Sequence, residues 1–121
     1  MTVLVERPRL LESQVWTKAC RLDMLLPGRG VAVLLPDGDQ AALFLLADGA
    51  LAAVGNIDPF FGAAVMSRGI TGDRRGEPTV ASPLLKHVFS LRDGRCLDDQ
   101  SYSLTVYDVR VNDGFVEVAR K

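Results

Sequence analysis

The chain has few of the residues that build metal and redox sites: its 121 residues include one histidine and two cysteines. The cysteines, Cys20 and Cys96, lie far apart, and neither belongs to a C-x-x-C pair of the kind that binds zinc. His87, the single histidine, excludes sites built from several imidazoles, and no catalytic motif supplies it with a nucleophile. We therefore predict no catalytic or cofactor-binding residue, no metal, and two free thiols in a reducing compartment.

The sequence also lacks a long apolar run and an excess of either charge. Its longest unbroken apolar run, residues 41–47, is far shorter than the roughly 18 residues that a membrane helix needs. Fourteen Lys and Arg residues against fifteen Asp and Glu leave no basic surplus for binding nucleic acid. The N-terminal segment is charged and has no apolar signal-peptide core. We therefore predict a cytoplasmic protein that binds neither membranes nor nucleic acid, with residues 1–13 flexible.

Short apolar runs separated by turn residues occupy most of the sequence. The turns are rich in Pro, Asp and Gly, and Asn112-Asp113-Gly114 is a strong hairpin signal. One helical turn is expected within residues 21–26. Many short strands with turns about every ten residues predict an all-β fold, an antiparallel sandwich or barrel. The predicted strands are residues 15–20, 31–35, 41–46, 51–54, 80–82, 87–91, 104–111 and 115–118.

Residues 55–77 differ from the rest because they are rich in Gly and Arg and show no sustained apolar period. We interpret them as a long excursion with little regular structure, which in a compact domain is usually functional. Within it, Arg74 and Arg75 stand beside Asp73 and Glu77. These charges form either a site that binds an anion or a partner, or an ordinary solvated loop.

Two segments combine a proline, a turn glycine and aromatic residues: Asn56–Ala63 (NIDPFFGA) and Ser82–Gly94 (SPLLKHVFSLRDG). They resemble the two cluster-binding loops of Rieske iron–sulfur domains. At the four ligand positions, however, two side chains have no donor atom and two offer hard oxygens, whereas the cluster needs two thiolates and two imidazoles. The resemblance therefore implies a scaffold that holds no cluster. The shared scaffold residues are Pro59, Gly62, Pro83, Phe89 and Gly94, and the degenerate ligand positions are Asp58, Phe60, Ser82 and Leu85.

Further runs narrow the resemblance to one family: SRGI at 67–70, GEPTVASPL at 76–84, LRDGRCL at 91–97 and VYDVRV at 106–111. In this order they resemble the small subunit of the cytoplasmic NADH-dependent assimilatory nitrite reductase, over nearly all of residues 15–118. Phe61 departs from the family pattern, in which a small polar residue is expected. The resemblance implies a single Rieske-like domain over residues 1–121, an antiparallel β-sandwich or barrel with an inserted paired-loop subdomain at about 55–97.

This resemblance also implies a role in nitrate assimilation. The complex reduces nitrite to ammonium with NADH, and its large subunit is expected to carry FAD, an iron–sulfur cluster and sirohaem. The present chain would be a non-catalytic accessory subunit without a cofactor that docks on the large subunit. Two alternatives stay open: a Rieske ferredoxin-like electron carrier, which the missing ligands oppose, and a β-sandwich accessory module of another oxidoreductase. The candidate partner contacts are Asp58, Phe60, Phe61, Arg68, Arg74 and Arg75.

The space that a cluster would occupy must be refilled, because protein interiors tolerate few voids. We expect Leu84 and Leu85 to fill it, with Asp58 and Ser82 accepting hydrogen bonds from backbone N–H groups of the two loops. Phe60 and Phe61 suit two roles equally well. They either join the same apolar plug or face outward and contact a partner, as exposed apolar residues on small domains often do.

Overall fold

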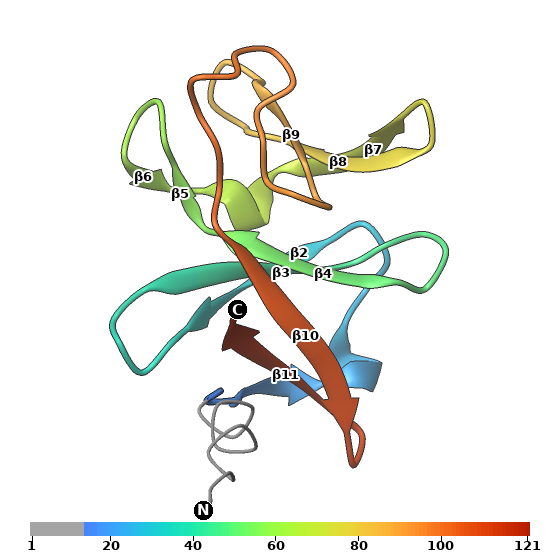
Figure 1. The fold of residues 1–121 in the computed structure, drawn as a ribbon. Coiled ribbons are helices and arrows are strands. Elements are labelled where there is room, and N and C mark those ends of the chain that lie inside the picture. Colours follow the sequence, from blue (N-terminus) through green and yellow to red (C-terminus); the bar gives the residue numbers. More distant parts are fainter. Residues whose placement is uncertain (1–13) are drawn as a thin grey trace, which may run out of the picture.

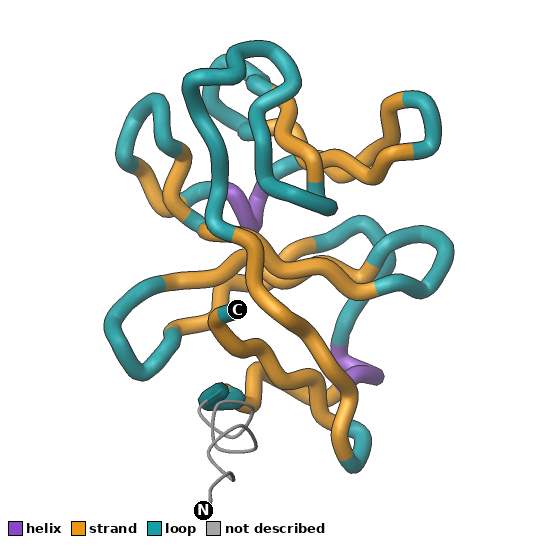
Figure 2. The backbone as a smooth tube through the Cα atoms, in the orientation of Figure 1, coloured by secondary structure: helices purple, strands orange, loops and turns teal. Residues whose placement is uncertain are grey.

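A computed structural model describes residues 14–121, and nearly every element within them is a β-strand (Figures 1 and 2). Six strands form the largest sheet, in the order β1-β11-β10-β4-β3-β2, with antiparallel neighbours. The sheet curls into a nearly closed barrel, which confirms the predicted antiparallel β fold. Its strands are β1 (Thr17–Arg21), β2 (Gly30–Leu34), β3 (Gln40–Leu45), β4 (Leu51–Gly55), β10 (Val106–Asn112) and β11 (Phe115–Arg120).

Two smaller sheets lie beyond one face of the barrel, together with a short 3-10 helix, and we call this group the small-sheet layer (Figure 1). A second 3-10 helix, η1 (Leu22–Met24), is the helical turn predicted within residues 21–26. No helix among residues 14–121 has the length and apolar character needed to span a bilayer. The small-sheet layer consists of β5 (Ile57–Asp58), β6 (Ala63–Ala64), η2 (Met66–Arg68), β7 (Ile70–Arg74), β8 (Glu77–Ala81) and β9 (Val88–Ser90).

The prediction that residues 55–77 have little regular structure is wrong. They contain all of β7, which pairs along its whole length with β8, from Ile70 opposite Ala81 to Arg74 opposite Glu77. β7 is an outer strand of its sheet and is largely exposed, so its sequence carries no apolar alternation that would reveal it. The prediction that residues 1–13 are flexible lies outside the described residues.

The two faces of β3 pack against two different clusters of buried residues, one inside the barrel and one toward the small-sheet layer. Because successive strand residues point to opposite faces, Ala41 and Leu43 pack inside the barrel, whereas Ala42 and Phe44 pack toward the small-sheet layer. All four side chains are fully buried. The continuous apolar run predicted for this strand is therefore the pattern of a strand that is covered on both sides.

Gly94 is required where the chain leaves β9. Its φ of +82° lies in the left-handed region that favours glycine, and a Cβ atom at this position would overlap the carbonyl oxygen of Leu104. The backbones are held together there, because Leu104 N–H donates a 2.7 Å hydrogen bond to Gly94 O. The loop that leads into β10 is thereby fixed against the end of β9.

Replacing Gly94 by alanine is expected to lower the free energy of unfolding by more than about 2 kcal/mol, because the added methyl group both strains the backbone and collides with Leu104. Gly49→Ala is the matched control: Gly49 has a φ of +89°, but no atom of the described part of the chain lies within 4 Å of an added Cβ. It should cost only about 1 kcal/mol. Urea denaturation of both variants checks this, and equal losses would contradict the steric account.

Candidate functional site

The two segments that resemble cluster-binding loops form two tight turns at the outer end of the small-sheet layer. In the first, Gly62 N–H donates to Asp58 O at 2.7 Å, and the Asp58 carboxylate accepts a 2.8 Å hydrogen bond from Phe60 N–H. In the second, Ser82 N–H donates to His87 O at 2.9 Å, and Ser82 Oγ accepts from Leu84 N–H at 3.1 Å. Asp58 and Ser82 thus bind backbone donors of their own turns, as predicted.

A buried hydrogen bond joins the two turns. The Ser82 hydroxyl donates to the second oxygen of the Asp58 carboxylate, and these side chains are at most 1% exposed. Each group therefore has a partner in its own turn and a partner across the gap, which satisfies the polar atoms that burial would otherwise leave unpaired. Asp58 cannot be a direct partner contact, because it is fully buried, so that part of the prediction is wrong.

Phe60 fills the space beside this bond as the middle ring of a stack. The centroid of its ring lies 3.8 Å from the centroid of the His87 ring, at an interplanar angle of 9°. The distance to the centroid of the Tyr102 ring is 3.9 Å, at an interplanar angle of 31°. It also packs against the buried cluster that lies between the barrel and the small-sheet layer. Of the two roles left open for Phe60, the structure favours the plug. Phe61, in contrast, is 52% exposed.

Leu85 does not belong to the plug, so the prediction for this residue is wrong. Its side chain is 74% exposed, whereas Leu84 is half-buried. The reason is local: Leu85 and Lys86 have φ values of 53° and 60°, both in the left-handed region. No glycine marks this bend, so the sequence gives no sign of it.

The side chains at the tip of the two turns do not fit a Rieske cluster. Asp58 and Ser82 bind each other, Phe60 has no donor atom, and Leu85 faces solvent. His87 is close to Phe60, and its buried Nδ1 has no hydrogen-bond partner among residues 14–121, but one nitrogen does not replace the four ligands of the cluster. Among residues 14–121, no three His, Cys, Asp or Glu side chains are grouped so that they could hold a metal ion.

The three arginines predicted as partner contacts are exposed on the small-sheet layer. Arg68 ends η2, whereas Arg74 and Arg75 lie at the turn between β7 and β8. Arg74 forms an ion pair with Asp98, at an N–O distance of 3.7 Å. They are thus divided between two elements of the layer, and their role as contacts stays a prediction.

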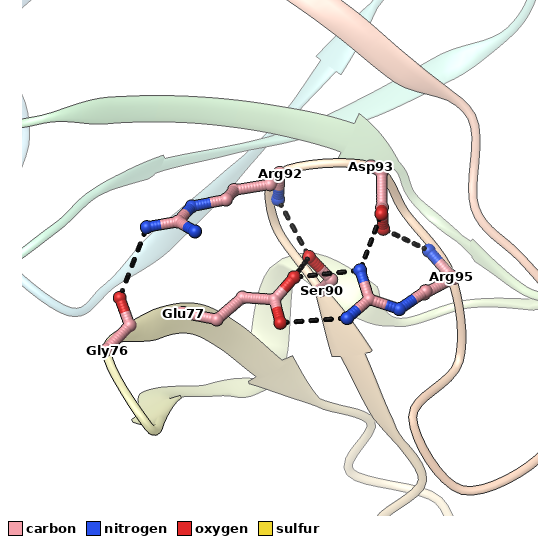
Figure 3. Close-up of polar contacts among 6 residues, drawn as sticks. All are labelled: Gly76, Glu77, Ser90, Arg92, Asp93 and Arg95. Carbon is pink, nitrogen blue, oxygen red and sulfur yellow. Dashed lines mark hydrogen bonds and ion pairs between the residues drawn. The ribbon is translucent and has the colours of Figure 1, made fainter.

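Sequence analysis missed an ionic network that joins β8, β9 and the following turn (Figure 3). The Arg95 guanidinium donates two 2.9 Å hydrogen bonds to the Glu77 carboxylate and one of 2.5 Å to Asp93, and the Ser90 hydroxyl also donates to Glu77 at 2.5 Å. The hydrogen bonds from Arg95 and Ser90 hold the pKa of Glu77 below its ordinary value of 4.5. Glu77 and Arg95 are 18 residues apart. The only local signal was the Asp93-Gly94 turn, where Asp93 also accepts from Arg95 N–H at 3.1 Å.

Comparisons with known proteins agree on one family. The model of the Rieske-like [2Fe-2S] domain matches residues 15–119. The chain is 45% identical over 104 residues to the nitrite reductase (NADH) small subunit of Salmonella typhimurium, covering 85% of this chain and 95% of that one. The crystal structure of a proposed NADH-dependent nitrite reductase small subunit from Mycobacterium tuberculosis superposes with a TM-score of 0.86 at 61% identity, covering 89% and 96% of the two chains.

A further relative is much longer than this chain. The chain is 38% identical over 111 residues to the nitrite reductase [NAD(P)H] large subunit of Klebsiella oxytoca. The match covers 92% of this chain but only 11% of the relative. A segment similar to almost the whole of this chain is therefore part of that longer polypeptide.

Phe60→Ala is expected to lower the free energy of unfolding by about 3 kcal/mol, because it removes the middle ring of the stack and leaves a cavity. The neighbouring Phe61→Ala is the matched control and should cost less than about 1 kcal/mol, since its ring is already exposed to water. Chemical denaturation of both variants measures the difference. A loss below about 1 kcal/mol for Phe60→Ala would show that this ring is no plug.

The Glu77 network predicts a dependence of stability on pH. A carboxylate whose pKa is lower in the folded chain than in the unfolded chain stabilises the fold above its unfolded pKa, and this stabilisation is lost as pH falls through the folded pKa. Wild type should therefore be more stable than Glu77→Gln at pH 7, and the difference should shrink as the pH falls below the ordinary Glu value of 4.5. Urea unfolding of both proteins between pH 7 and pH 3 checks this. A difference that stays constant over the range would rule out the ionic contribution.

Proposed function

We propose a function for this chain from the premise that it belongs to the small subunits of the NADH nitrite reductases, a family with a Rieske-like fold. The observation that carries the proposal is the 45% identity to the Salmonella small subunit over nearly the whole of that protein. The chain acts as an accessory subunit of an NADH-dependent nitrite reductase, which reduces nitrite to ammonium in the cytoplasm. Its partner is the large subunit of that enzyme.

The long Klebsiella relative supports this partner. In that relative, the segment similar to this chain is part of the large-subunit polypeptide, so a covalent backbone links this segment to the rest of the large subunit. Where the small subunit is a polypeptide of its own, as in the Salmonella relative that the match covers to 95%, association comes instead from a binding surface. The relative therefore favours docking on the large subunit over the alternative of an accessory module for another oxidoreductase.

The side chains of the two turns support a role without electron transfer by this chain. The four cluster-ligand positions offer no thiolate or imidazole, and the two oxygen-bearing groups are already bonded to each other. The FAD, the iron–sulfur cluster and the sirohaem then belong to the large subunit. This chain contributes by docking against that subunit and by ordering or shielding part of its electron path. A ferredoxin-like carrier is the weaker alternative, because the four ligand positions carry Asp, Phe, Ser and Leu.

A tagged full-length chain is expected to recover the large subunit from a native lysate, together with sirohaem absorbance and NADH-dependent nitrite consumption. The chain purified alone should contain no stoichiometric iron. Deleting its gene should abolish NADH-dependent nitrite reduction in the lysate, and adding back the purified chain should restore it. Recovery of a different oxidoreductase, or unchanged nitrite reduction after the deletion, would contradict the proposal. A brown protein with stoichiometric iron would instead favour the carrier.

A further inference from the structure

The two joined turns present an apolar surface to solvent. Phe61 projects from the first turn with 52% of its side chain exposed, and Leu85 projects from the second with 74% exposed. Pro83, beside Leu85, is also exposed. The Ser82–Asp58 bond at the base of the turns and the contact between the Phe60 and His87 rings bring these residues to the same end of the small-sheet layer. We call Phe61, Pro83 and Leu85 the apolar tip.

The composition of the apolar tip is that of an interface centre. Residues 59–62 and 83–85 contain no charged side chain, and the nearest charge in sequence beyond Leu85 is that of Lys86. The centres of protein interfaces are depleted in charge and enriched in aromatic residues, whereas their rims are polar. An aromatic ring and a leucine on a small domain, bordered by a lysine, match this arrangement.

The backbone of the second turn of the apolar tip has an uncommon conformation. Leu85 and Lys86 are consecutive left-handed residues without being glycine, a conformation that residues with a side chain rarely adopt. The surrounding contacts, not an intrinsic preference of Leu85, therefore keep this side chain pointing into water.

A second apolar surface lies at the seam between the barrel and β7, and it serves as a comparison. Leu26 and Ile70 are 58% and 66% exposed, and the segments that carry them meet where the Thr71 hydroxyl lies 3.5 Å from Gly28 O. Charged residues accompany both side chains, since Arg29 and Arg68 are close to them in sequence. Lys86 borders the apolar tip in the same way, so charge does not separate the two surfaces. The seam is the weaker candidate because neither of its exposed side chains is aromatic, whereas the apolar tip contains Phe61.

We propose that the apolar tip, Phe61, Pro83 and Leu85, is the surface on which this chain docks against an uncharged apolar recess of the nitrite reductase large subunit. This inference rests on the proposed function and adds to it the location of the contact. The long Klebsiella relative, in which a similar segment belongs to the large-subunit polypeptide, supports the large subunit as the occupant. Phe61 and Leu85 are the anchors, and their chain neighbours Phe60 and Leu84 are half-buried.

The test measures the dissociation constant between the purified full-length chain and the large subunit from the same organism. Phe61→Ser removes one anchor. Leu85→Asn removes the other while keeping a residue type that tolerates the left-handed backbone, so the fold is preserved. The double variant should weaken binding by at least about tenfold, the usual loss when interface anchors are truncated. Its urea midpoint should equal that of wild type.

The matched control is the seam variant Leu26→Ser/Ile70→Ser, which should change the dissociation constant by less than about twofold, as non-interface surface substitutions do. If the wild-type chain binds the large subunit and the tip variant binds it equally tightly, the proposed location of the contact is overturned, but the proposed function stands. A large loss in the seam variant alone also overturns it and moves the contact to the seam. If the wild-type chain shows no binding to the large subunit, the proposed function itself fails, and the docking surface fails with it.

Discussion

The hydrogen bond from Ser82 to Asp58 is the constraint on which the outer end of the small-sheet layer depends. It is the buried polar link between two turns that belong to different sheets, and each of its two side chains also accepts a hydrogen bond from the backbone of its own turn. In a low-dielectric interior, a polar group that loses its partner costs more than the net gain from making the bond. The two turns therefore form as a pair, because each supplies what the other needs.

This link holds one end of the β8–β9 pair, and the Glu77 network holds the other. Ser82 follows β8 directly, whereas Glu77 begins it, and Ser90 at the far end of β9 donates to Glu77. Between these two polar ends, Val80 pairs with Phe89, and both side chains are fully buried. The strand pair thus has an apolar centre with a polar tie at each end. This arrangement gives the attached turns a fixed position relative to the barrel.

The parts of the structure that follow from local pattern were predictable from the sequence, and those that follow from distant contacts were not. The β10–β11 hairpin is an example of the first kind: Asp113 and Gly114 both have positive φ, as a two-residue turn between Asn112 and Phe115 requires. β7 and the Glu77–Arg95 pair are of the second kind, because an exposed polar strand and an ion pair across 18 residues leave no periodic signal.

The site itself was predictable in its chemistry and less so in its geometry. The sequence suffices to show that Asp58 and Ser82 are oxygen groups that suit backbone donors, because side chains of this kind bind the backbone of their own turns. It does not show that Leu85 faces solvent, since that orientation comes from a left-handed backbone without a glycine. Nor does it choose between Phe60 and Phe61, which are adjacent and chemically identical. Only the stacking partners His87 and Tyr102, both distant in sequence, distinguish them.

These contacts also bear on what it would take to return a cluster to this scaffold. New thiolates at positions 58 and 82 would replace the bond that joins the turns, and an imidazole at position 60 would have to leave the stack between His87 and Tyr102. A histidine at position 85 would still point into water unless the left-handed backbone at residues 85 and 86 were reversed. Four substitutions are therefore not enough, because the backbone and the ring packing have been built around a different interior. Phe61 and Leu85, which are exposed at the two turns, are apolar, and the four ligand positions carry no thiolate or imidazole.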